Sequence, residues 1–462
     1  MIMGNVRYCY AQNCVHIVGA TIRELFDKGV PRKLSVAGLR SYLEYGCVYE
    51  PLTIVEGVRV MREGEKGARG EDDERGERGE DGERGEKDLV LRGVEAAVRR
   101  AMPERPAAYL SGGIDSSAVV AVMRRLTKEP IDTFCVIHED PKCDEREWAR
   151  MVAKANGTRH HEMLLTPAMI KANIRQALDD YDQPSLDGIN NWFAAKMVKE
   201  LGFDTVLSGN GGDELFVGYW DFAKQRMAYK YGNWLRHVPR SVGRLVERCG
   251  ANEKVKKLGM LMGAKGDPYF QVRRVFSDSM IDRLIGSELS HAGAKVCAEE
   301  LEALAAAAPK GDLINRISWL ELQTSVRSMY VRDGWNMARA HGIEVRSPLL
   351  DPELVDLVLG IPGTEKLGSI PKHLLVEAAG EGLPMACVTR PKKGFSLPFN
   401  IYFREALKDE MDAFLSGELW DGLDKRTIQK LWKDYEAGKV WWTRIWGLFV
   451  LSYWIKKNGM NL

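Results

Sequence analysis

The residues with the clearest chemical signature are 111–117, S-G-G-I-D-S-S, which follow a short apolar run at 107–110 and precede a helical pattern at 118–125. In such a strand, loop and helix unit the glycine pair lets the backbone approach an anion, and the first helical N–H groups face that anion. The stretch lacks the Lys-Ser/Thr pair of the P-loop that transfers a γ-phosphoryl group. It therefore predicts a phosphate cradle for a different reaction on a nucleotide.

A second glycine-rich loop, S-G-N-G-G-D-E-L-F at 208–216, follows a predicted strand at 204–207. Further strands are expected at 131–137 and 160–165, and helices at 144–156, 170–181 and 190–201. Alternating strands and helices indicate an α/β fold with a parallel sheet. Ligands of such sheets bind at the carboxyl ends of the strands, so both loops are expected to form walls of one pocket.

The chain divides into four segments by composition. Residues 1–60 are too few to form a hydrophobic core of their own and should pack against the residues that follow them. Residues 61–87 are charged and glycine-rich, without apolar residues after Ala68, and read as a solvated, mobile loop; the segment has no proline, which excludes collagen. Residues 88–220 form the predicted nucleotide-binding core, and 221–462 are mainly helical.

The 462 residues carry 66 Lys and Arg against 65 Asp and Glu, a net charge of +1. No global field should therefore draw the chain onto nucleic acid or a membrane, although local basic patches remain open. The 8 cysteines show no metal-ligand spacing, and the adjacent His160 and His161 should point to opposite faces of a strand, which disfavours a shared metal. No segment reads as a signal peptide or membrane span, so a cytoplasmic protein is expected.

With these stretches in place, residues 40–455 resemble the synthetase half of the asparagine synthetase family. The resemblance rests on the motifs at 111–117 and 208–216, on H-G-I-E-V-R-S-P-L-L-D at 341–351 and on R-P-K-K-G-F at 390–395. It implies a pyrophosphate-loop domain of the adenine-nucleotide α-hydrolase type with a helical C-terminal extension. It also implies ATP and Mg²⁺ as cofactors, an acyl-adenylate formed by attack of a carboxylate on the α-phosphorus, and an amide formed with ammonia.

The resemblance also implies roles for individual residues. Asp115 and Asp213 would share Mg²⁺, although Asp115 also reads as a carboxylate at a helix start. Lys392 would neutralise charge at the adenylate and is favoured over Lys393, although a basic loop exposed to solvent, with neither lysine catalytic, is the alternative. Pyrophosphate would be held by Ser111, Gly112, Gly113, Ser116 and Ser117, while Leu110, Val136, Ser208 and Gly209 would surround adenine and ribose, with Leu110 and Val136 also reading as buried strand residues. Ion pairs are expected from Glu344, Arg346 and Asp351, with Arg346 alternatively meeting the substrate.

Three features depart from the family pattern. Residue 2 is Ile2, where the glutaminase domain of the family has a cysteine, so this chain is not expected to hydrolyse glutamine unaided. Asn210 replaces a carboxylate and cannot act as a base. Trp335 replaces an acidic residue.

The first functional hypothesis is an amide-forming ligase that acts on aspartate, with free ammonia or ammonia from a separate glutaminase subunit. The same chemistry on another carboxylate, such as a peptide side chain, a β-amino acid or a sugar acid, is the second. A non-catalytic ATP-binding subunit paired with a glutaminase is the third, and a homodimer remains open.

Overall fold

The computed structural model describes the chain in eight stretches, and all structural statements below refer to them. They are residues 6–12, 15–62, 82–141, 143–218, 220–250, 253–390, 402–403 and 405–462.

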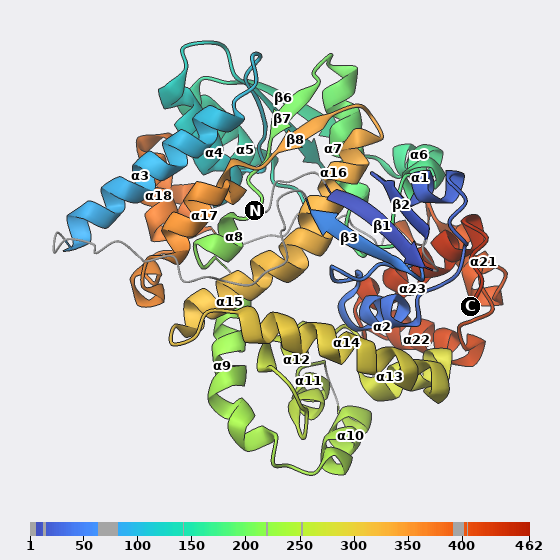
Figure 1. The fold of residues 1–462 in the computed structure, drawn as a ribbon. Helices are drawn as coiled ribbons and strands as arrows, with labels where there is room; N and C mark the ends of the chain where they lie inside the picture. The colour runs from blue at the N-terminus through green and yellow to red at the C-terminus, as the bar shows by residue number, and fades with distance from the viewer. Residues whose placement is uncertain are drawn as a thin grey trace.

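A five-stranded parallel sheet forms the centre of the α/β part of the molecule (Figure 1). The three strands expected at 131–137, 160–165 and 204–207 are present, and the parallel arrangement is confirmed. In spatial order the strands are β6 (Arg159–Leu164), β5 (Asp132–Ile137), β4 (Ala107–Tyr109), β7 (Thr205–Leu207) and β8 (Glu344–Arg346).

Strand β8 was not expected, because the C-terminal half was interpreted as mainly helical. Its three residues pair in parallel with β7, with Val345 opposite Val206. A three-residue strand has too little alternation to stand out in a sequence, and here the edge of an existing sheet stabilises it.

Helices cover both faces of this sheet. Side chains that alternate along the strands, such as Leu207 and Val206, enter two different hydrophobic clusters. This is the pattern expected of strands that are buried on both faces. The cluster of Leu207 includes α3 (Gly82–Ala101), α4 (Ile114–Leu126) and α5 (Arg146–Asn156), and that of Val206 includes α7 (Ile189–Glu200).

Helix α3 begins at Gly82, which corrects the expected loop boundary at residue 87. Glu, Arg and Lys are good helix formers, so the apolar stripe around Val90 and Val94 propagates the helix backwards through charged sequence. Residues 63–81, the rest of the predicted mobile loop, lie outside the described residues.

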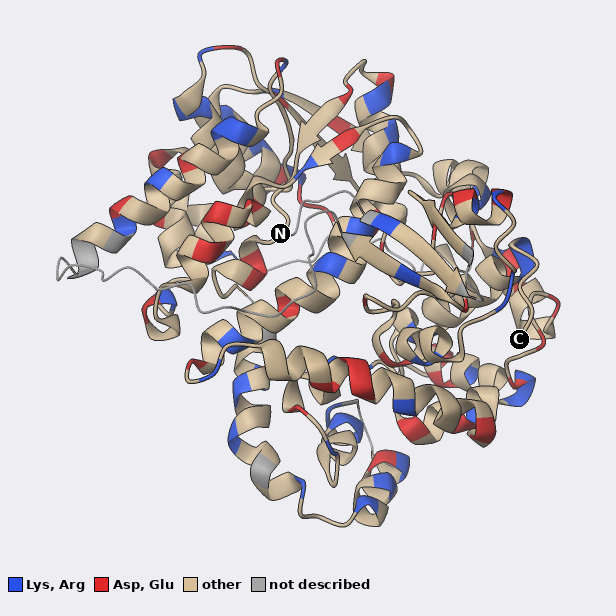
Figure 2. Cartoon of the chain, viewed as in Figure 1, with Lys and Arg blue, Asp and Glu red and all other residues tan. Residues whose placement is uncertain are grey.

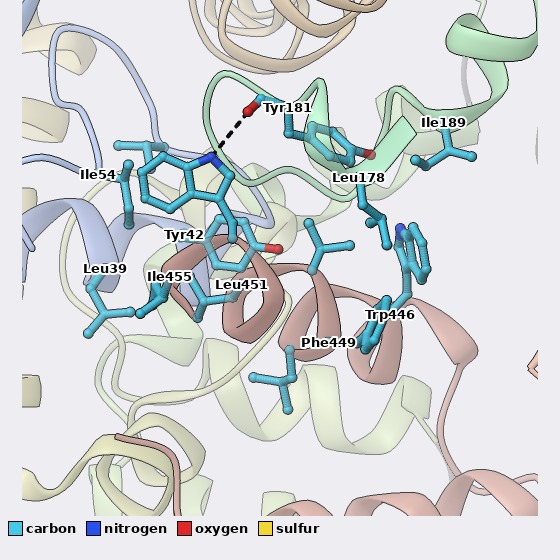
Figure 3. Close-up of a cluster of buried hydrophobic side chains, with 14 of the residues drawn as sticks. Leu39, Tyr42, Ile54, Leu178, Tyr181, Ile189, Trp446, Phe449, Leu451 and Ile455 are labelled. Atoms are coloured by element: carbon cyan, nitrogen blue, oxygen red, sulfur yellow. Dashed lines mark hydrogen bonds between the residues drawn. The ribbon is translucent and has the colours of Figure 1, made fainter. Parts of the chain in front are cut away.

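The first 60 residues add an antiparallel sheet, which was not expected as a unit, beside two helices. They share a core with the C-terminal helix α23 (Trp442–Lys457), as expected from their small size (Figure 3). Tyr42 Oη donates a hydrogen bond to the Gly447 carbonyl at 2.8 Å, and Trp454 Nε1 donates to the Tyr181 carbonyl at 3.2 Å. The sheet order is β2 (Val15–Gly19), β1 (Val6–Gln12) and β3 (Val58–Arg62), and the helices are α1 (Ile22–Asp27) and α2 (Val36–Tyr45).

The remaining elements are helices, apart from β8. Those after β6 and β7 are α6 (Pro167–Asp179) and α8 (Gly212–Leu215), followed by a protrusion of α9 (Trp220–Leu235), α10 (Arg240–Cys249), α11 (Glu253–Leu261) and α12 (Pro268–Arg273). Next come α13 (Asp278–Ile285), α14 (Ser287–Ala307), α15 (Leu313–Glu321), the π-helix η1 (Leu322–Val331) and α16 (Arg332–Arg339). The last are η2 (Pro348–Leu350), α17 (Pro352–Leu359), η3 (Gly363–Lys366), α18 (His373–Ala379), η4 (Gly380–Gly382), α19 (Met385–Thr389), α21 (Lys408–Ser416) and α22 (Lys425–Glu436).

The seven cysteines of the described stretches are free thiols, and four of them are buried: Cys47, Cys135, Cys297 and Cys387. In these same stretches no helix has both the length and the apolar composition that crossing a bilayer requires.

Candidate nucleotide and carboxylate site

One pocket of about 690 Å³ lies where strands β4, β5 and β7 end. Because β4 and β7 are neighbours, with Ala108 opposite Leu207, the two glycine-rich loops that follow them meet at this edge. The expectation that both loops form walls of one pocket is confirmed. Its walls include these predicted residues: Leu110, Ser111, Gly113, Asp115, Ser116, Val136, Ser208, Gly209 and Asp213.

Two residues of the first loop do not line the pocket. Gly112 has a φ of +71°, and a Cβ at this position would lie 2.4 Å from the backbone carbon of Trp148. Its role is therefore to let the loop turn close against α5. The Ser117 side chain is fully buried and lies inside α4.

The hydroxyls of the first loop organise its backbone. Ser111 Oγ accepts a hydrogen bond from the Gly113 N–H at 3.2 Å, and Ser116 Oγ lies 3.2 Å from Ser111 Oγ. Gly113 is the N-cap residue of α4, so the positive end of the helix dipole points into the pocket beside these hydroxyls. Together these groups form a cradle suited to phosphate oxygens.

The second loop packs directly on the first. A Cβ at Gly209 would lie 2.6 Å from the Ser116 backbone nitrogen, and one at Gly212 would lie 2.2 Å from Asp115 Oδ1. Glycine is thus required at both positions for the loops to touch, a requirement that neither loop reveals alone.

Replacing Gly209 with alanine is expected to push the loops apart, because the obstacle is backbone. We expect a loss of about 1 to 3 kcal/mol in the free energy of unfolding and weaker ATP binding. Thermal denaturation and calorimetric titration with ATP would measure both. Gly85→Ala in α3 is the matched control, since a Cβ there meets nothing within 4 Å. Unchanged ATP affinity in Gly209→Ala would contradict the close packing of the loops.

The two loops share a cation that sequence reasoning missed. Lys372 Nζ lies 2.5 Å from Asp115 Oδ2 and 2.7 Å from Asp213 Oδ1, and its side chain is only 5% exposed. Burial alone would lower the pKa of Lys372, but Asp115 and Asp213 outweigh it and raise the pKa above its ordinary value. The ammonium is therefore held charged at the centre of the pocket.

Lys372 precedes α18 with a φ of +52°, which is unusual for a residue other than glycine. A strained backbone at a pocket is often associated with function. The sequence I-P-K-H around Lys372 contains no spacing that marks this lysine, so only its place in the fold identifies it.

The predicted catalytic residue Lys392 and its neighbour Lys393 lie outside the described residues. The first residue of their motif, Arg390, is described and lines the pocket. Its Nη2 donates to Glu145 Oε1 at 2.6 Å, and its guanidinium stacks over Trp148. Arg390 is thus the last described residue before the segment that carries Lys392.

Three asparagine residues belong to the pocket walls. Asn190, Asn191 and Asn210 all line the pocket. A Cβ at Gly334 would lie 3.8 Å from Asn191 Nδ2 and 3.9 Å from Asn210 Nδ2. The residue at 334 therefore decides how much space remains beside these two amides.

Two further residues line the pocket, Asp187 and Tyr330. Burial raises the pKa of Asp187, opposed by hydrogen bonds from the Gly188 backbone and the Asn190 side chain. Tyr330 lies in the π-helix η1, a helix type that is often found at functional sites. Neither residue stands in a motif that the sequence singled out.

Other singled-out residues lie elsewhere. Trp335 does not line the pocket and is stacked by Arg339 at 5.1 Å. His160 Nδ1 contacts Thr133 Oγ1, whereas His161 Nε2 contacts Asp132 Oδ1. The two adjacent histidines thus contact two consecutive residues of β5, one each, and do not share a partner.

The H-G-I-E-V-R-S-P-L-L-D motif forms ion pairs, as predicted. Arg346 pairs with Glu344 at 2.7 Å, and Arg346 Nη1 also donates to the Ala101 carbonyl. Asp351 pairs with Arg100 at 2.6 Å and caps α17, which ties α17 to α3. Arg346 is not among the residues that line the pocket, so the geometry gives no contact with a substrate there.

Comparisons with known proteins agree with this arrangement. Residues 89–456 match the family model described as asparagine synthase. The chain is 24% identical over 387 residues to "Asparagine synthetase [glutamine-hydrolyzing] 1" of Bacillus subtilis (strain 168), which covers 80% of this chain and 59% of that protein. It is 25% identical over 361 residues to "Putative asparagine synthetase [glutamine-hydrolyzing]" of Mycobacterium tuberculosis (strain ATCC 25618 / H37Rv), covering 75% and 54%.

A shorter match, 34% identical over 153 residues, links the chain to "Asparagine synthetase [glutamine-hydrolyzing] 3" of Arabidopsis thaliana and covers 29% of this chain and 26% of that protein. The chain thus spans somewhat more than half the length of the two bacterial relatives. Since the family model covers most of the chain, including both glycine-rich loops, the chain belongs to the asparagine synthase family.

Proposed function

We propose that this chain is an ATP-dependent ligase that adenylates a carboxylate, releases pyrophosphate and forms an amide with ammonia. Aspartate is the substrate we favour, since the relatives are called asparagine synthetases. The observation that carries the proposal is the convergence of Asp115, Asp213 and Lys372 in one pocket with the serine and glycine cradle.

In the first step a substrate carboxylate oxygen forms a bond to the α-phosphorus of ATP, and the bond from the α-phosphorus to the bridging oxygen breaks. Negative charge accumulates on the departing pyrophosphate. Ser111, Gly113 and Ser116 can hold this group with hydroxyls, backbone N–H groups and the dipole of α4. Lys372 supplies a fixed positive charge that needs no reorganisation during the reaction.

Leu110, Val136, Ser208 and Gly209 are assigned to adenine and ribose. Leu110 and Val136 are buried apolar residues at the ends of adjacent strands, and both line the pocket. Gly112 and Ser117 were predicted to touch pyrophosphate. We assign them instead to shaping the loop, because neither residue lines the pocket.

Asp115 and Asp213 fit a magnesium site. Carboxylate oxygens from the two loops approach one point, the Lys372 ammonium, within 2.7 Å. Mg²⁺ prefers one or two carboxylates together with phosphate oxygens, which is the donor set that these residues and ATP would provide. When bound, the ion would offset charge on the phosphates of ATP.

In the second step ammonia attacks the acyl carbon, the bond from that carbon to the phosphate oxygen of AMP breaks, AMP leaves, and the nitrogen loses a proton to water. Asn210 and Asn191 line the same pocket, and we assign their amides to orienting the acyl group by hydrogen bonds, since they cannot accept this proton. The ammonia is taken from solution or from a separate glutaminase subunit.

The test is pyrophosphate release from the purified chain with Mg-ATP, aspartate and ammonium chloride, with asparagine measured by mass spectrometry. We expect aspartate-dependent release that falls at least about a hundredfold in Asp115→Asn. Asp204→Asn is the matched control, because Asp204 is an exposed carboxylate paired with Lys199. A preparation that binds ATP but shows no aspartate-dependent release would exclude asparagine synthesis by this chain alone.

A further inference from the structure

The helical protrusion of α9, α10 and α11 exposes large apolar side chains to solvent. Helix α9 presents Met227, Tyr231 and Trp234, of which Trp234 is 70% exposed, and α10 presents Val242 and Leu245, the latter 61% exposed. Exposed apolar residues that gather on one element often mark an interaction site. In Figure 1 this protrusion lies below α14, away from the parallel sheet.

The exposed residues of α9 lie on one face of that helix. Residues 227, 231 and 234 are spaced by four and three, which places them on one stripe. The opposite face is buried, through Phe222 and Gln225. Helix α9 therefore packs against the protein with one face and exposes Met227, Tyr231 and Trp234 on the other.

Helices α10 and α11 are held back to back, which fixes the direction of the exposed face of α10. A Cβ at Gly243 would lie 2.7 Å from the Gly259 carbonyl oxygen, so the two backbones touch. Arg240 Nη1 donates to the carbonyls of residues 259, 260 and 262 at 3.0 to 3.1 Å. Val242 and Leu245 consequently face outward on a preformed surface.

The same protrusion is strongly basic. Residues 220–261 contain ten Lys and Arg against three Asp and Glu, whereas the whole chain has a net charge of +1. Figure 2 shows Lys and Arg recurring along α9 and α10. Lys230, Arg236, Arg244 and Arg248 are all exposed beside the apolar residues.

We propose that the α9–α11 protrusion docks on an anionic lipid surface. Tryptophan, tyrosine and aliphatic side chains next to Lys and Arg are the composition of helices that lie in the interface of a bilayer. The cations would contact lipid phosphates while Trp234, Met227 and Leu245 enter the boundary of the acyl chains. The net charge of the whole chain conceals this patch, because acidic residues elsewhere balance it.

Two other occupants fit these observations less well. A nucleic acid would use the cations but would leave Met227, Val242 and Leu245 exposed, since backbone contacts are polar. A second copy of this chain would bring the same positive charge against itself, which disfavours pairing. An anionic bilayer matches both the charge and the apolar groups.

The experiment is sedimentation of the whole chain with vesicles. We expect binding to vesicles of equal parts phosphatidylcholine and phosphatidylglycerol, none to pure phosphatidylcholine, and weakening by salt. Each lost cation should weaken binding about five-fold. The double variant Arg244→Glu with Arg248→Glu should therefore lower the apparent affinity at least about tenfold. Trp234→Ala with Leu245→Ala should lower it by a similar factor through lost apolar burial.

The control is Lys128→Glu with Arg159→Glu, an equal change of charge at exposed positions. Lys128 follows α4 and Arg159 begins β6, elements that Figure 1 draws at the opposite end of the molecule from α9 to α11. This variant should bind vesicles as the unchanged chain does, and circular dichroism should show all variants folded. Equal losses in the control and the Arg244 and Arg248 variant would overturn the proposal. The proposal would also be overturned if the chain did not bind vesicles but either self-associated in sedimentation velocity or bound RNA, and if that association were lost in the Trp234 and Leu245 variant.

Discussion

Replacing Lys372 with methionine is expected to lower pyrophosphate release at least about a hundredfold. The change keeps the length of the side chain but removes the ammonium that lies between Asp115 and Asp213. Two partly buried carboxylates would then face each other and the phosphates of ATP without a cation. The measurement is the rate of pyrophosphate release at saturating ATP, with ATP affinity determined separately.

The same variant is expected to be less stable, by about 3 to 5 kcal/mol, because it breaks a buried ion pair. Lys372→Arg separates the two roles. It keeps the charge, so thermal stability should largely return, but the planar guanidinium cannot take the position of a compact ammonium, and activity should remain low. Full activity in Lys372→Arg would show that Lys372 matters only as a positive charge.

Lys392→Ala completes this comparison, since sequence reasoning favoured Lys392 as the catalytic cation. If Lys372→Met remains active and Lys392→Ala does not, Lys372 is a structural counter-ion of the two loops. If both lose activity with folding intact, the pocket uses two cations, one from the residue before α18 and one from the segment after Arg390.

Replacing Lys366 with methionine is expected to change how stability depends on pH. Lys366 ends the short helix η3, is 2% exposed and donates a hydrogen bond from Nζ to Asn315 Oδ1 at 2.6 Å. Burial lowers its pKa to about 7, and the nearby Asp312 only partly opposes this shift. The folded state therefore favours the neutral amine, whereas an unfolded chain has a charged lysine up to about pH 10.4.

The folded and unfolded pKa values of Lys366 determine in which direction stability changes with pH. The stability that this group contributes is fully present above the unfolded pKa and is lost progressively as the pH falls from there to the folded pKa near 7. The difference in unfolding free energy, Lys366→Met minus the unchanged chain, should therefore grow by about 4 kcal/mol between about pH 10 and about pH 7. Denaturant titrations across that range would measure it.

Taking the difference between the two chains removes the titration of all other groups, including the raised thiol pKa of Cys47. Lys310→Met is the matched control, since Lys310 is an exposed lysine of the same region. Its difference from the unchanged chain should stay constant with pH. A constant difference for Lys366→Met as well would mean that Lys366 stays charged in the folded protein, held by Asp312.

The sequence by itself determined the parts of this protein that depend on local pattern. Strand β5, which ends in the apolar residues Phe134 to Ile137, and the loops at 111–117 and 208–216 were identifiable because an apolar run and glycine content are local properties. Both loops could be assigned to one pocket because parallel strands end at one edge of a sheet. The family resemblance followed from the same motifs and agrees with the family model.

Tertiary structure alone decided the rest, for reasons of distance along the chain. Lys372 is 257 residues from Asp115, and nothing near it in the sequence marks a partner for two distant carboxylates. Strand β8 exists because β7 offers an edge, and the first 60 residues are stable because α23 completes their core. Ser117 and Gly112 match the motif as well as Ser111 does, yet they face away from the pocket, since a motif gives residue types and the packing of α4 and α5 sets their directions.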